Sequence, residues 1–86
     1  GYELVEHSTA DDSTDEKAAA ATCPAGKLAV GGGYHIEIVH GMDILVYYSV
    51  PWNEGQGWLV QATENTPDAN TWILTAYAIC VTAPTG

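Results

Sequence analysis

Two cysteines, Cys23 and Cys80, carry the most readily assigned chemistry of this chain. They are the only cysteines among 86 residues, and each lies in or beside a segment of strand-like sequence. In a small, acidic, β-rich chain such a pair is more often a structural disulfide than a nucleophile, because disulfides stabilise small cores in oxidising compartments. We therefore expect a Cys23–Cys80 disulfide and an extracellular location, either secreted, on a cell surface or on a virion.

Acidic side chains gather in one polar segment. Asp11, Asp12, Asp15 and Glu16 place four carboxylates within six residues. Calcium prefers clustered oxygen ligands, and the spacing Asp11-x-Ser13-x-Asp15 resembles the start of an EF-hand loop, but the glycine and the final glutamate of that loop are absent. We expect a solvated acidic loop in which the three aspartates are weak metal candidates, and we expect no cofactor.

No motif for catalysis or phosphate binding is recognisable. The histidines, which are His7, His35 and His40, lack the spacing of zinc sites. No Gly-x-Ser-x-Gly motif presents a nucleophile, and loop acids alone do not define a glycosidase pair. The Gly31-Gly32-Gly33 triplet precedes no helix, so it indicates a bulge or bend where a backbone or an aromatic ring packs closely. We expect a domain that is not an enzyme.

Aromatic residues provide one candidate for ligand contact. Trp58 and Trp72 lie in strand-like sequence and are expected in the core, whereas Trp52 stands in a polar, glycine-rich stretch. Trp52, Asn53 and Tyr47 are therefore candidates for contact with a cell-surface glycan or protein.

The charge of the chain excludes several classes of partner. Its formal net charge is −9, with Lys17 and Lys27 as the only fixed cations. Nucleic acids and anionic membrane surfaces select basic patches, and no apolar run approaches the ~18 residues of a membrane span. We expect no nucleic-acid partner and no membrane insertion. The chain starts without methionine or a signal-peptide pattern, so we expect it to derive from a longer precursor.

Alternating apolar residues and regular turn signals predict an all-β fold, a small antiparallel sandwich or jelly-roll-like domain. The expected strands cover residues 2–7, 17–23, 28–30, 34–39, 44–50, 58–64 and 71–82. The alanines of 17–23 favour a helix by propensity, but this short segment ends before Pro24, which favours a strand. We expect Pro51 to end its strand and 52–57 to form a loop. Residues 1–86 should form one domain, with N-terminal strands and the acidic loop in 1–22 and the sandwich core in 23–86.

Two of these strands, 44–50 and 71–82, are apolar on both faces. One face of each can fill the core, and the other needs cover from a loop, a second sheet or a neighbouring subunit. Because a chain of this size forms only a marginal core, we expect a homo-oligomer. Its interface should include the second apolar set of the last strand, which is Ile73, Tyr77, Ile79 and Val81.

Several blocks together resemble the small C-terminal β-domain that follows collagen-like repeats in bacterial and phage-encoded surface and fibre proteins. They are GYELV at 1–5, TCPAGK at 22–27, GGGY at 31–34, SVP at 49–51, GWLV at 57–60 and LTAYAIC at 74–80. The CPAGK and LTAYAIC blocks are specific in combination, whereas the acidic loop departs from the family's usual Ser/Thr-rich loop. The resemblance implies a trimeric, all-β, non-enzymatic cap or attachment tip on a collagen-like stalk or fibre.

Two other functions stay open. The domain could be a glycan-binding module that uses Trp52 and neighbouring polar groups. It could also be the subunit of an extracellular filament whose copies exchange their N-terminal strands.

Overall fold

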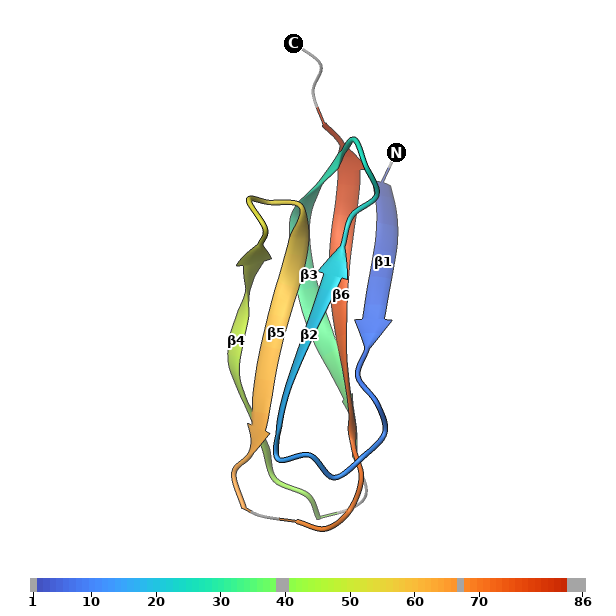
Figure 1. Ribbon diagram of the computed structural model, residues 1–86. Helices are drawn as coiled ribbons and strands as arrows, with labels where there is room; N and C mark the ends of the chain where they lie inside the picture. The colour runs from blue at the N-terminus through green and yellow to red at the C-terminus, as the bar shows by residue number, and fades with distance from the viewer. Residues whose placement is uncertain (1, 39–40, 67, 84–86) are drawn as a thin grey trace.

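Six strands form two antiparallel three-stranded sheets that pack face to face in the computed structural model (Figure 1). The structure describes residues 2–38, 41–66 and 68–83. The strands are β1 (Tyr2–Ser8), β2 (Glu16–Thr22), β3 (Lys27–Glu37), β4 (Ile44–Trp52), β5 (Gly57–Glu64) and β6 (Ile73–Thr82). One sheet has the order β1-β6-β3 and the other β2-β5-β4. The predicted all-β sandwich is confirmed, and the segment expected at 17–23 forms strand β2 (Glu16–Thr22) rather than a helix.

The strand order is that of a shortened jelly roll. An eight-stranded jelly roll keeps this order when its fifth and sixth strands are removed. Here β4 and β5 are joined directly through a turn at residues 53–56, so each sheet keeps three strands. No helix in the described part of the chain is long and apolar enough to cross a membrane.

The domain is a narrow rod of 50 × 17 × 15 Å. The start of β1 and the end of β6 lie together at one end, which we call the terminal end (Figure 1). The β1–β2, β3–β4 and β5–β6 connections lie at the opposite end, which we call the loop end. Anything attached to either terminus therefore leaves from the same end of the rod.

The core is thin because small side chains fill most of it. Among the described residues, the largest fully buried side chains are Trp72, Leu74, Val60 and Cys80. Alanines complete the core, at positions 19, 21, 62, 76 and 78. The predicted disulfide is confirmed and ties the two sheets together, since Cys23 follows β2 and Cys80 lies in β6.

The glycine triplet lies inside one continuous strand, β3. The pairing of β3 with β6 shifts between Ala29 and Gly31, which leaves Val30 as a bulge. A Cβ atom added to Gly32 would overlap the Trp58 ring and come within 2.5 Å of the Tyr77 carbonyl oxygen. The predicted bulge and the close aromatic packing are therefore both confirmed. Val39, predicted to extend this strand, lies outside the described residues.

Most strand boundaries differ from the prediction by one or two residues, and two of the differences change the role of a tryptophan. β4 continues through Pro51 to Trp52, because an edge strand tolerates the missing N–H of proline on its unpaired side. Trp52 is thus a strand residue, and the turn begins at Asn53. The last strand begins at Ile73, while Trp72 forms an isolated bridge with Asp12.

Candidate functional site

The outer surface of the β1-β6-β3 sheet is apolar, and we call it the β6 face. Three rows of paired residues cross it near the terminal end: Tyr2–Val81–Leu28, Leu4–Ile79–Gly31 and Glu6–Tyr77–Gly33. Tyr2, Leu4 and Ile79 are 76%, 57% and 37% exposed, although exposed positions usually favour polar groups. The predicted interface residues Ile73, Tyr77, Ile79 and Val81 all lie on this face. The opposite side of β6 is buried from Leu74 to Cys80.

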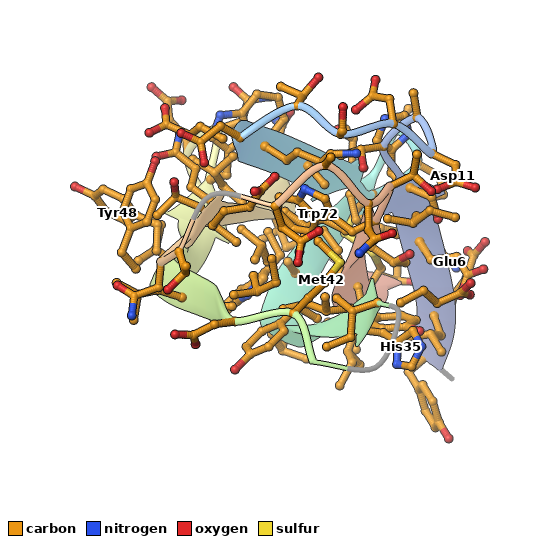
Figure 2. All side chains as sticks on the ribbon, turned by 90° about the horizontal axis from the view of Figure 1, so that it is seen from below. Glu6, Asp11, His35, Met42, Tyr48 and Trp72 are labelled. Atoms are coloured by element: carbon orange, nitrogen blue, oxygen red, sulfur yellow. A yellow bond between two sulfur atoms is a disulfide. The ribbon has the colours of Figure 1, made fainter. Side chains whose placement is uncertain are left out.

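The outer surface of the β2-β5-β4 sheet, which we call the β5 face, mixes exposed apolar side chains with polar ones. Its rows are Thr22–Gly57–Trp52, Ala20–Leu59–Val50, Ala18–Gln61–Tyr48 and Glu16–Thr63–Leu45. Leu45 and Tyr48 are each half exposed. The sequence predicted that 44–50 is apolar on both faces, and Trp52, a ligand-contact candidate, lies in the first of these rows. The faces of the two sheets point in opposite directions, as Tyr48 and His35 show in Figure 2.

The three ligand-contact candidates do not form one cluster. Trp52 lies on Gly57, and the Asn53 side-chain amide donates a hydrogen bond to Gln56 Oε1 in the adjoining turn. Tyr47 lies five residues earlier on β4, a separation of about 16 Å along a strand. Its ring packs edge to face against Tyr48. A glycan would therefore have to be long to touch both ends of this set.

Tyr47 has an acidic neighbour instead of a polar partner from the turn. Its hydroxyl has a pKa above the ordinary value, because surrounding atoms desolvate it and because the hydrogen-bonded Glu16 carboxylate opposes its ionisation. The nearby Glu16 carboxylate therefore favours the protonated form of the Tyr47 hydroxyl.

The acidic loop is largely exposed to solvent, as expected, and it is also anchored to the core through Lys17 and Asp12. Lys17, which is buried, extends its ammonium group beneath the loop and donates hydrogen bonds to the carbonyl oxygens of Ala10 and Trp72. It also pairs with Asp12 Oδ1 at 2.9 Å and lies 5.0 Å from the centre of the Trp72 ring. The indole N–H of Trp72 donates to the Thr14 carbonyl oxygen. Figure 2 shows Trp72 between the sheets and Asp11 at the surface.

The Lys17–Asp12 pair predicts a measurable pH dependence. Hydrogen bonds from Lys17 and Thr14 lower the pKa of Asp12 from 3.8 to about 2. A pKa lowered by folding means that the ionised Asp12 stabilises the domain above pH 3.8, and that this contribution is lost as the pH falls toward 2. We expect Asp12→Asn to lower the melting temperature at pH 6 and to reduce its fall between pH 4 and 2.

Thermal melts across this pH range check the prediction. Asp11→Asn is the matched control, since it removes the same charge from the neighbouring exposed position but spares the ion pair. Equal pH profiles for the wild type and Asp12→Asn would contradict the role of the ion pair.

The acidic residues do not assemble a metal site among the described residues, where no group of three or more His, Cys, Asp or Glu side chains could hold an ion. Asp12 is occupied by Lys17, and Asp11 and Asp15 are exposed. His7 and His35 are exposed on β1 and β3, and His40 lies outside the described residues. Two hollows at the loop end, of about 170 and 200 Å³, are smaller than the roughly 300–1,000 Å³ of ordinary ligand pockets.

Charge is distributed unevenly along the rod. Most acidic residues lie toward the loop end, namely Asp11, Asp12, Asp15, Glu16, Glu37, Asp43, Glu64 and Asp68. At the terminal end, Glu3 is neutralised by Lys27 at 2.7 Å. The rows of the two faces nearest the terminal end therefore lie away from most of the negative charge, whereas the Glu16–Thr63–Leu45 row lies within it.

Comparisons of the chain with protein-family models, with curated proteins and with solved structures find no match.

Proposed function

We propose that this domain is a non-enzymatic, extracellular structural and interaction domain that assembles with copies of itself. The proposed assembly is a homotrimer that caps a collagen-like stalk or forms the attachment tip of a fibre. The trimer and the stalk come from the family resemblance, and the extracellular location is compatible with the Cys23–Cys80 disulfide.

The exposed β6 face is the observation that carries the proposal. It leaves Tyr2, Leu4 and Ile79 exposed to water, while alanines make up much of the core in the described part of the chain. Covering this face with a second copy would add the burial that a domain of this size lacks. Both lysines are already engaged in ion pairs within the chain, so the contact would depend on apolar burial rather than on opposite charges.

The position of the termini supports a role at the end of a stalk. Since β1 starts at the terminal end, a preceding stalk would join there and the loop end would point away from it (Figure 1). Three chains held side by side at their N-terminal ends would have a high effective concentration for winding a collagen triple helix.

The substitution Ile79→Asp tests self-assembly. It would place an unpaired carboxylate in the middle of the covered β6 face, which is costly without a partner. We expect the wild type to have the mass of three chains by light scattering at micromolar concentration, and Ile79→Asp to be monomeric with an intact disulfide and a β-type circular dichroism spectrum. A monomeric wild type would refute the proposal.

A filament is the second candidate, because the partly apolar β5 face lies opposite the β6 face. A subunit with interaction surfaces on two opposite sides can add further copies without forming a closed ring. Exchange of the N-terminal strand has less support, since β1 pairs with β6 of its own chain over its full length. An open filament would appear in light scattering as a mass that keeps rising with concentration.

A further inference from the structure

We propose that the trimer closes with its three β6 faces turned toward the threefold axis, so that the β1 edge of each copy packs against the β3 edge of the next. The inference rests on the proposed self-assembly and names the two edges that meet. It uses the same face of every copy, and it leaves every β5 face on the outside of the trimer.

The strand order of the β6 face fixes which edges meet in a closed ring. Its strands have the order β1-β6-β3, with β6 in the centre. When three copies are related by rotation about an axis parallel to the rod, this order has the same sense around the ring in each copy. Every corner of the ring therefore joins a β1 edge to a β3 edge, and β6 lies nearest the axis. All chain termini leave from the same end of the ring, as a preceding stalk requires (Figure 1).

Both edges carry exposed apolar side chains near the terminal end. Tyr2 and Leu4 on β1 are more than half exposed, and Leu28 and Val30 on β3 are 36% and 65% exposed. Rotation about the axis leaves the height of each residue along the rod unchanged. Since Tyr2 and Leu28 share a row within one chain, Tyr2 of one copy lies level with Leu28 of the next. The contact would therefore cover the exposed apolar side chains of both edges at once.

Beyond these residues, the β3 edge carries glycine where the β1 edge carries a larger side chain. Gly31 shares its row with Leu4, and Gly33 shares its row with Glu6. Neither glycine has a positive φ angle. An added Cβ at Gly33 would meet no atom within 4 Å, and one at Gly31 would make only an ordinary contact with the Ile79 side chain at 3.8 Å. Glycine within a strand costs stability, and it marks places where another group approaches closely. In the ring, that group is the β1 edge of the neighbouring copy.

Charge identifies the occupant as a second copy of this chain. The net charge is −9, so two copies repel each other across most of their surfaces. The rows of the β6 face that contain Val81, Ile79 and Tyr77 carry a single carboxylate, that of Glu6, and it lies level with Gly33. In the ring the three Glu6 residues lie at separate corners, about three strand spacings or roughly 14 Å apart. Their repulsion is screened, because this separation exceeds the Debye length of about 8 Å at physiological ionic strength.

Disulfide trapping between the two edges tests the inference. Glu6→Cys and Gly33→Cys place one thiol on each edge in the same row. Within one chain these positions lie on either side of β6, two strand spacings or about 10 Å apart, which is too far for a disulfide. The native cysteines are already bonded to each other.

After mild oxidation of the double variant, we expect non-reducing gel electrophoresis to show chains linked in twos and threes and no larger species. A closed ring holds only three corners, and each corner joins two different chains. Each single variant should stay unlinked, because its thiols lie at separate corners of the ring.

Tyr48→Asp is the matched control for Ile79→Asp. Tyr48 is half exposed like the residues of the β6 face, but it lies on the β5 face, which the ring leaves outside. We expect Tyr48→Asp to have the mass of three chains by light scattering, whereas Ile79→Asp is monomeric.

Four results would overturn the inference and leave self-assembly standing. They are linked products that end at two chains, linked products larger than three chains, a trimeric double variant that forms no links, and a folded Tyr48→Asp variant that is monomeric. A monomeric wild type would instead remove the proposed function itself.

Discussion

Replacing Gly32 with alanine should unfold the domain, although the change adds a single methyl group. The new Cβ would overlap the Trp58 ring and crowd the carbonyl oxygen of Tyr77 on the neighbouring strand. Trp58 cannot move away without loss, because it packs against the core and its indole N–H donates a hydrogen bond to Ser49. Overpacking of this kind costs about 3 kcal/mol or more, which is a large part of the stability of a small domain.

Urea denaturation followed by tryptophan fluorescence measures the effect. Gly33→Ala is the control, since its Cβ would meet nothing and alanine reduces the entropy of the unfolded chain. We expect Gly33→Ala to unfold within about 1 kcal/mol of the wild type. If Gly32→Ala were as stable as Gly33→Ala, the close contact between β3 and Trp58 would be wrong.

Removing the disulfide should have the largest effect of all. Cys23 and Cys80 are separated by 57 residues, and both are buried. Closing a loop of this length restricts the unfolded chain by about 4 kcal/mol. We expect a Cys23→Ala, Cys80→Ala variant to lose about this much stability and to be largely unfolded at 37 °C as a monomer. Denaturation of the wild type with and without reductant gives an independent measure, and equal midpoints would contradict the prediction.

The Gly32→Ala variant and the double-cysteine variant also separate the effects of folding from those of assembly. Gly32 and the cysteines act inside one chain, whereas Ile79 lies on the β6 face. Loss of the disulfide should lower stability at every protein concentration. Loss of the contact at the β6 face should remove only the part of the stability that rises with concentration, because assembly stabilises the folded state by mass action.

The sequence by itself determined the features that depend on local backbone geometry or on a unique chemical partner. Side chains of a strand alternate between its faces, so the two apolar sets of β6 could be assigned from their spacing. The disulfide could be assigned because only two cysteines exist. The close packing at the glycine triplet could also be anticipated, since a strand interior disfavours glycine without such a cause.

Other features were decided only by which strands meet. The triplet shows three identical residues, yet only Gly32 faces Trp58, because the bulge at Val30 sets which side each glycine faces. Pro51 does not end β4, because β4 lies at a sheet edge, and edge position is a property of the whole topology. The acidic loop is held by Lys17 through atoms of Trp72, a residue 55 positions away in the chain.

The β5 face shows most clearly that strand order is decided by the tertiary structure. Its bulky edge comes from β4 and its small edge from β2, and these strands are joined only through β5. Alternation along each strand predicts which residues share a side of that strand, because this follows from the local geometry of the chain. It does not predict which strand lies beside it, because strand order depends on contacts between distant segments. The apolar sides were therefore visible in the sequence, whereas the two opposite surfaces that they build were decided by the tertiary structure.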